Sequence, residues 1–307
     1  MEPIPIWIDC DPGVDDAVAL LLARRMETIC LRGLSAVAGN VALEKTCANL
    51  LKVRALMGSD CPVYAGAARP LRRAPIDASF FHGPDGLGGV TLPDPGLPPE
   101  PAPAWEALYQ AARREPGRLH LIALGPLTNV ATAFALHSDL PGLLARVLLM
   151  GGAVQGGNRT PWAEFNVYAD PEAAQQVFSA QVPLVMCGLD VTTRAYLTRE
   201  ELDNLSACGA PQVMALRQMQ NRALDRVLAA GAPGLAMHDP CPVLCLGYPE
   251  LFQGRSARVR VLTEDGPQLG RTLADFESDS PNCMVILGVD RPAFVQVLTE
   301  HLARYTG

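Results

Sequence analysis

Short apolar runs rich in β-branched residues alternate with longer amphipathic stretches along most of this chain. This alternation is typical of strands and helices that feed one mostly parallel sheet. Strands are predicted at residues 4–9, 33–38, 119–124, 146–150 and 183–187, and helices at 15–25, 42–57 and 292–304. The pattern therefore predicts an α/β fold.

An open, mostly parallel sheet of this kind, with helices on both faces, is Rossmann-like. Six prolines between residues 93 and 103 exclude a helix or a central strand there, so residues 69–105 are predicted to form a long surface loop. Residues 257–263 and 271–276 flank a Gly266-Pro267 turn, which predicts a small C-terminal β-hairpin. No repeat or linker divides the chain, so we expect a single domain over residues 1–307.

The composition excludes several classes of protein. The 307 residues are 49% hydrophobic and carry a formal net charge of -7, which argues against a nucleic-acid partner and makes phosphorylated substrates less attractive. The N-terminal residues lack the pattern of an export signal, and the apolar stretch 17–23 is too short to cross a bilayer. Nine scattered cysteines without a repeated CxxC spacing indicate reduced thiols. We therefore expect a cytoplasmic protein with no membrane partner.

Four aspartates, Asp9, Asp11, Asp15 and Asp16, fall within eight residues at the end of the first predicted strand. Their charges would repel one another strongly without a cation among them. Because the neighbouring residues offer oxygen rather than sulfur or imidazole, a hard ion, Ca²⁺ or Mg²⁺, fits better than Zn²⁺. The competing interpretation is that they cap the following helix, which accounts for Asp15 or Asp16 but hardly for all four.

A further acid stands far downstream, just ahead of a predicted helical stretch that runs through Leu246. Asp239 is a candidate metal ligand, and His238 beside it is a candidate proton donor. The alternative is that Asp239 caps the helix and His238 is a bystander.

Residues that suit a sugar follow the strand predicted at 146–150. A glycine turn there is followed by Asn158, Glu164 and Asn166, whose oxygens and amides can bind vicinal hydroxyls. The alternative is an ordinary polar loop with Phe165 packed into the core.

Eight segments together resemble the inosine-uridine nucleoside hydrolase family, in the expected order and across nearly the whole chain. They are DCDPGVDDAVAL at 9–20, VAGN at 37–40, HGPDGLG at 82–88, ALGPLTNVA at 123–131, MGG at 150–152, EFN at 164–166, DPEAA at 170–174 and HDP at 238–240. The resemblance implies Ca²⁺-dependent hydrolysis of the N-glycosidic bond of free ribonucleosides to ribose and nucleobase, by a homodimer or homotetramer.

The resemblance also implies a role for each site residue. Asp11, Asp16, Asp239 and the backbone carbonyl of Leu124 would bind Ca²⁺. Asp11 would activate the metal-bound water, and His238 would assist the departing base. The expected substrate-binding residues are Asp15, Asn40, His82, Asn158, Glu164, Phe165, Asn166 and Asp239. The exact roles of His82 and Asp9 stay open, as does the base preference, because residues 217–237 contain no aromatic side chain.

The chemistry of the bond agrees with an acidic pocket. Cleavage develops positive charge on the ribose ring, which carboxylates facing the sugar stabilise, while the same field repels a 5′-phosphate. Two alternatives stay open. One is a Mg²⁺-dependent haloacid-dehalogenase-type phosphatase with Asp9 as its nucleophile, and the other is a catalytically inactive ribose- or nucleoside-binding protein.

Overall fold

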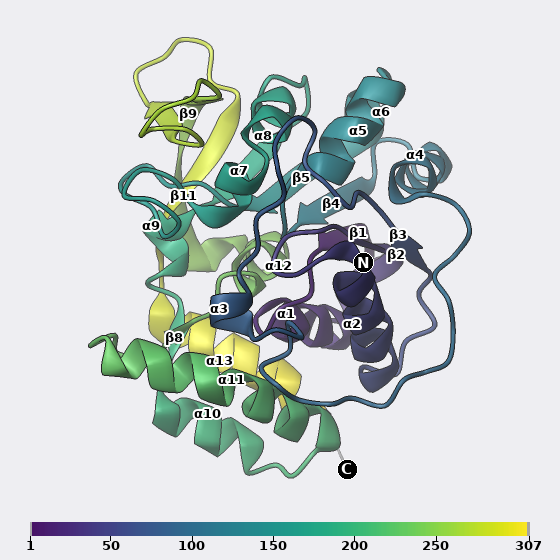
Figure 1. Ribbon diagram of the computed structural model, residues 1–307, viewed down its shortest axis with the longest axis vertical. Helices are drawn as coiled ribbons and strands as arrows, with labels where there is room; N and C mark the ends of the chain where they lie inside the picture. Colours follow the sequence, from purple (N-terminus) through teal and green to yellow (C-terminus); the bar gives the residue numbers. More distant parts are fainter. Residues whose placement is uncertain (1, 306–307) are drawn as a thin grey trace.

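The computed structural model describes residues 2–305 and is built around one nine-stranded sheet. Its strands follow the order β10-β9-β11-β6-β5-β4-β1-β2-β3. Figure 1 shows this sheet extending from β9 and β11 on one side to β2 and β3 on the other. The neighbouring strands from β3 to β6 are parallel, and so are β6 and β11. Their bounds are Ile4–Cys10 (β1), Ile29–Ala36 (β2), Val63–Ala65 (β3), Leu119–Ala123 (β4), Leu144–Met150 (β5), Leu184–Cys187 (β6) and Cys283–Val289 (β11). The predicted α/β fold is confirmed.

Side chains that alternate along the strands build a separate apolar core on each face of the sheet. In β1, Ile6 and Ile8 pack into one core and Trp7 into the other. The first core is covered by α1 (Asp16–Arg25), α2 (Leu43–Leu56), α10 (Arg199–Ser206), α11 (Pro211–Ala229), α12 (Pro240–Gly247) and α13 (Arg291–Leu302). The second is covered by α4 (Ala104–Arg114), α5 (Thr128–Leu136), α6 (Leu140–Leu143) and α8 (Pro171–Phe178).

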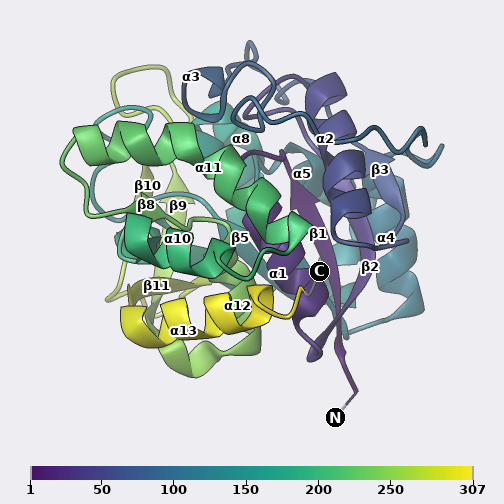
Figure 2. The ribbon, with the colours of Figure 1, turned by 90° about the horizontal axis from the view of Figure 1, so that it is seen from below.

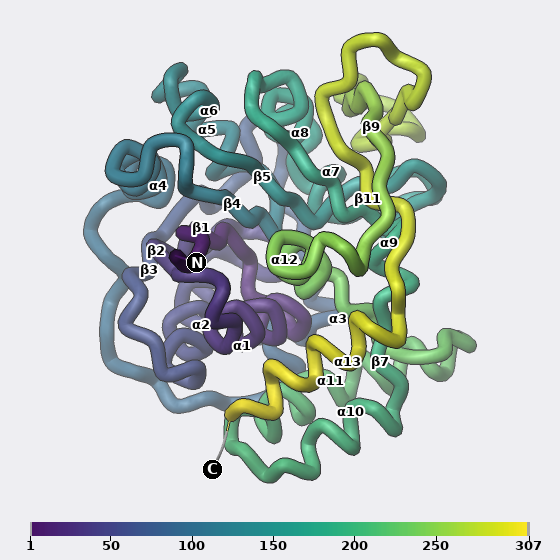
Figure 3. The backbone as a smooth tube through the Cα atoms, turned by 180° about the vertical axis from the view of Figure 1, so that it is seen from behind, coloured from purple at the N-terminus to yellow at the C-terminus, as the bar shows by residue number. Residues whose placement is uncertain are grey.

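The helices of the first face form two layers. Figures 2 and 3 show α10, α11 and α13 grouped outside α1, which lies against the sheet. The remaining elements are short: α3 (Ser79–His82), α7 (Phe165–Ala169), α9 (Leu189–Thr192), the 3-10 turn η1 (Pro249–Leu251), and the two-stranded sheet of β7 (Tyr196–Leu197) and β8 (Leu235–Ala236). None of the helices between residues 2 and 305 combines the length and apolar character needed to cross a membrane.

The C-terminal hairpin is present but continues the main sheet. β9 (Phe252–Val261) pairs with β10 (Thr272–Asp275) as predicted, and it also pairs antiparallel with β11. β11 was not among the predicted strands, although its sequence CMVILGV is an apolar run. The start of β2 also differs, at Ile29 rather than Gly33, because Arg32 breaks the apolar pattern. Arg32 is skipped at an irregularity in the pairing of β2 with β1, and its side chain bonds to Glu115.

The long loop between β3 and α4 is irregular as predicted, apart from α3. That short helix lies against α11, where Arg226 Nη1 donates a hydrogen bond to the carbonyl oxygen of Phe80 at 2.8 Å. Because β1, β2, β4 and β5 are parallel, the loops that follow them meet at one edge of the sheet. This edge is where open α/β sheets bind their ligands.

Candidate active site

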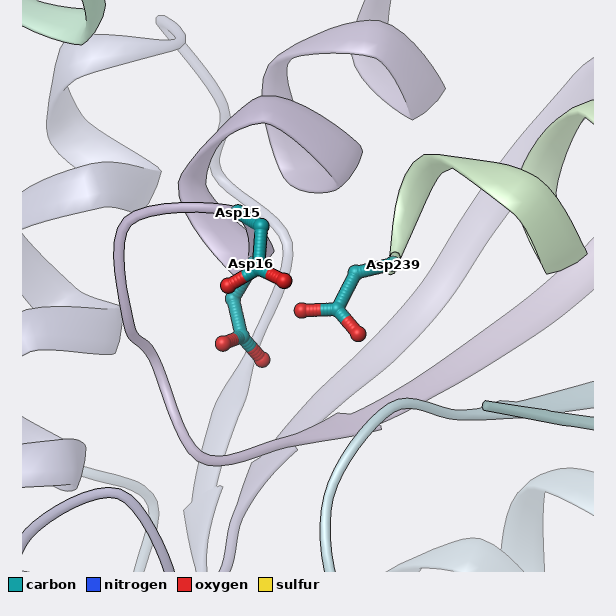
Figure 4. A group of neighbouring side chains, drawn as sticks. All are labelled: Asp15, Asp16 and Asp239. Atoms are coloured by element: carbon teal, nitrogen blue, oxygen red, sulfur yellow. The ribbon is translucent and has the colours of Figure 1, made fainter. Parts of the chain in front are cut away.

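The loop between β1 and α1 gathers carboxylates at this edge. Asp15 and Asp16, at the start of α1, face Asp239 at the start of α12 (Figure 4). One carboxylate oxygen from each of the three lies within 4.8 Å of the others. Gly13 lets the ring of His82 pack closely against this loop, since a Cβ atom there would collide with that ring. The structure thus brings together acids that are more than 220 residues apart in the sequence.

The carboxylates of Asp15 and Asp239 do not cap helices. Both residues occupy N-cap positions, of α1 and α12, yet neither side chain accepts a capping hydrogen bond. Other acids of this chain do cap helices, since Asp170 and Asp290 accept backbone N–H groups at the starts of α8 and α13. The capping interpretation therefore does not explain the acids of the site.

Asp16 lies below the floor of the site and is completely buried. Its Oδ2 accepts hydrogen bonds from the backbone N–H of Gly13 at 2.8 Å and from Asn40 Nδ2 at 3.3 Å. Its Oδ1 has no partner among residues 2–305. Burial, followed by the charge of Asp15, raises the pKa of Asp16 to about 7. A buried, partnerless carboxylate oxygen beside further carboxylates fits a hard cation.

Asp11 is held between the loops that follow β2 and β4. Its Oδ2 accepts the backbone N–H of Asn40 at 2.7 Å. A Cβ atom at Gly39 or Gly125 would collide with the carboxylate, so only glycine leaves room on these two sides. Burial and then the charge of Asp16 raise the pKa of Asp11. Without a nearby positive charge, this carboxylate is therefore costly to ionise, which is a further sign that the site suits a cation.

Asp9 points away from the pocket. Its Oδ1 accepts hydrogen bonds from the Ser35 hydroxyl and from Asn129 Nδ2, the latter at 2.7 Å. Asn129 also bonds to the carbonyl of Ala36, so Asp9 ties β1 to β2 and α5. Burial raises the pKa of Asp9 to about 6. This placement argues against the phosphatase alternative, which needs Asp9 as an exposed nucleophile.

A pocket opens above the carboxylates, and eleven of the twelve predicted site residues line it. They are Asp11, Asp15, Asn40, His82, Leu124, Asn158, Glu164, Phe165, Asn166, His238 and Asp239. The twelfth, Asp16, lies just beneath. The pocket is also lined by residues that were not predicted: Ala78, Phe80, Phe81, Met150 and Arg159.

Phe80 and Phe81 supply aromatic surface that α11 lacks. Phe80 is 50% exposed, and the guanidinium of Arg226 stands 5.2 Å from its ring centroid. Phe81 packs edge-on against His82. The available signal in the sequence was two consecutive aromatic residues directly before His82 in an otherwise polar, proline-rich loop.

The loop after β5 is fixed by bonds to the backbone. Glu164 accepts the N–H groups of Gly152 and Asn166, both at 2.9 Å, and burial raises its pKa to about 7. Asn166 Nδ2 donates to the carbonyl of Leu124 at 2.7 Å. A carbonyl oxygen has two lone pairs, so Leu124 keeps one for a further partner. Asn158 Oδ1 accepts the N–H of Phe165 at 2.8 Å.

Two histidines line the same pocket. The backbone N–H of Val14 donates to His82 Nδ1 at 3.3 Å, and His238 Nδ1 lies 2.8 Å from the hydroxyl oxygen of Thr192. Burial lowers the pKa of both imidazoles, which favours their neutral forms.

Comparison with known proteins identifies this arrangement. The model of the inosine-uridine preferring nucleoside hydrolases matches residues 6–296. The fold and the acidic pocket are thus those of an N-ribosyl hydrolase that acts on ribonucleosides. The chain belongs to the inosine-uridine preferring nucleoside hydrolase family, whose members depend on a metal ion.

Individual relatives match this chain over almost its full length. The pyrimidine-specific ribonucleoside hydrolase RihA of Citrobacter koseri is 38% identical over 308 residues, covering 98% of this chain and 99% of that protein. Among solved structures, a plant nucleoside hydrolase, the PpNRh1 enzyme, has a TM-score of 0.93 at 29% identity and covers 98% of this chain and 99% of its own. A purine-preferring ribonucleoside hydrolase from Gardnerella vaginalis has the same TM-score at 28% identity, with 98% of both chains covered.

Proposed function

We propose that this protein hydrolyses free ribonucleosides with a pyrimidine base, in a reaction that requires Ca²⁺. The observation that carries this proposal is the partnerless Oδ1 of buried Asp16, beside two other carboxylates, beneath a pocket lined with polar groups that suit ribose. The name of the RihA relative, at 38% identity, supports the pyrimidine base. Release of ribose from uridine, with and without a calcium chelator, tests the proposal.

The ion would be held by oxygen atoms alone. We assign the carboxylates of Asp11, Asp16 and Asp239 and the carbonyl of Leu124 as its ligands, a set that suits Ca²⁺ better than a softer metal. When bound, Ca²⁺ supplies a positive charge that orients the attacking water and lowers its pKa. Asp15 has a carboxylate oxygen within 4.8 Å of those of Asp16 and Asp239, and we assign it to the ribose.

The side chains of the site carry out the remaining steps of the reaction. Asp11 accepts a proton from water as the water oxygen bonds to C1′ of the ribose. The bond between C1′ and the base nitrogen breaks, and its electron pair leaves with the base. His238 donates a hydrogen bond to the departing base, which stabilises that electron pair. The positive charge that develops on the ribose is stabilised by the carboxylates beneath it.

The remaining residues orient the substrate. Asp15, Asn166 and Asp239 would hold the 2′ and 3′ hydroxyls. The 5′ hydroxyl would lie near Asn158 and Glu164, the base near Phe165 and His82, and Asn40 would orient the groups on the metal side, where it already bonds to Asp11 and Asp16. The same proposal includes one domain over residues 1–307, a homodimer or homotetramer, a cytoplasmic location, and no nucleic-acid or membrane partner.

Removal of metal is expected to change the pH dependence of stability. Since burial raises the pKa of Asp16 from 3.8 to about 7, its contribution to the metal-free protein is full below about pH 4 and is lost as pH rises through about 7. A bound cation favours the ionised form instead. Adding Ca²⁺ to stripped protein should therefore raise the unfolding temperature more at pH 8 than at pH 5, measured by circular dichroism.

The matched control for this measurement is Asp16→Asn, which removes the titrating charge from the floor of the site. In this variant, the rise in unfolding temperature on adding Ca²⁺ should differ less between pH 5 and pH 8 than it does in the parent protein. An equal shift at pH 5 and pH 8 in the parent protein, or no shift at either, would contradict the assignment of Asp16 as a ligand.

A further inference from the structure

Thr192 does not line the pocket itself but contacts His238, which does. It is the last residue of α9, which follows β6, and it is completely buried. Its hydroxyl oxygen lies 2.8 Å from His238 Nδ1. Because the ring of His238 lines the pocket, a bond at Nδ1 leaves Nε2 as the nitrogen available to a bound molecule.

The direction of this hydrogen bond follows from the surroundings of Thr192. The neighbouring Thr193 shows the usual arrangement in a helix, with its hydroxyl donating to the carbonyl of Leu189 at 2.7 Å. The hydroxyl of Thr192 makes no such bond, and within residues 2–305 its side-chain partner is His238 Nδ1. If Nδ1 carried the imidazole hydrogen, the buried hydroxyl hydrogen would have no acceptor, which is costly.

The neutral imidazole therefore accepts at Nδ1 and carries its hydrogen at Nε2. His82 shows the same arrangement through a different partner. A backbone N–H can only donate, so the bond from Val14 to His82 Nδ1 leaves the hydrogen of that neutral imidazole at Nε2.

We propose that Thr192 is a positioning residue that keeps the hydrogen of His238 on Nε2 and directs it to the departing base. This inference rests on the proposed function, in which His238 assists the leaving group. Without the Thr192 hydroxyl, the imidazole is free to rotate or to place its hydrogen on Nδ1. In either case the base loses its hydrogen-bond donor, while the attack of water at C1′ is left intact.

The test compares Thr192→Val, which removes the hydroxyl at nearly constant shape, with Thr192→Ser, which restores it. Thr192→Val should lower kcat for uridine by about tenfold or more, while kcat for p-nitrophenyl riboside, whose leaving group needs little assistance, changes by less than about threefold. Thr192→Ser should recover most of the activity on uridine. Thr193→Val, which removes the adjacent hydroxyl, is the matched control and should leave both substrates unaffected.

Epistasis separates the failure of this inference from the failure of the proposed function. In a protein that already carries His238→Ala, adding Thr192→Val should cause no further loss on uridine. If His238→Ala selectively slows uridine but Thr192→Val does not, Thr192 has no positioning role. The same conclusion holds if Thr192→Val slows both substrates equally. Should His238→Ala itself slow both substrates equally, the assignment of His238 in the proposed function is wrong.

Discussion

Replacing Asp11 with asparagine is expected to lower kcat for uridine by about a thousandfold or more, because asparagine cannot accept the proton of the attacking water. The substitution keeps the size of the side chain and an oxygen that can accept the N–H of Asn40. The pocket should therefore keep its shape. Inhibition by free ribose should change much less than kcat, and steady-state kinetics with a ribose-release readout measures both quantities.

The control for this variant is Asp60→Asn. Asp60 is an exposed acid just before β3, at the opposite edge of the sheet from the pocket, so the substitution changes net charge equally. It should leave kcat unchanged. If Asp11→Asn hydrolysed uridine at the parental rate, Asp11 would not be the base.

Replacing His238 with alanine should produce a loss that depends on the leaving group. With uridine, kcat should fall by about a hundredfold, since a positioned donor contributes on this scale. With p-nitrophenyl riboside, the loss should stay below about threefold. The ratio of the two rates is more informative than either rate alone, because a general disturbance of the pocket slows both substrates.

The matched control is His137→Ala. His137 follows α5 and is paired with Glu106, on the face of the sheet covered by α4 and α5. Its removal should affect neither substrate. Equal losses on both substrates for His238→Ala would remove its role in departure of the base.

The acids after β1 were predictable because they lie close together in the sequence. Four aspartates within eight residues at the end of a strand already indicate a cation, although the structure turns one of them, Asp9, away from the pocket. His238 and Asp239 became interpretable through the resemblance of their segment to a family motif. The parallel sheet then explains why these distant segments meet, since the carboxyl ends of its strands share one edge.

Other features depend on contacts that no local pattern reveals. Phe80 and Phe81 face the pocket because α3 rests on α11, through the bond from Arg226 to the carbonyl of Phe80. Asp9 belongs to the same acidic run as Asp11, yet its direction in β1 turns it toward Asn129 of α5, 120 residues away. In the same way, β11 joins the sheet through pairing with β6 and β9, which the sequence pattern does not specify.

The most direct measurement is ribose release by the purified protein from uridine, cytidine and inosine, before and after metal is stripped by a chelator. We expect the pyrimidine nucleosides to be preferred, the stripped protein to be inactive, and Ca²⁺ to restore activity. Phosphate release from a phosphomonoester, with no ribose released from any nucleoside, would contradict the account, and full activity of the stripped protein would remove the metal from it.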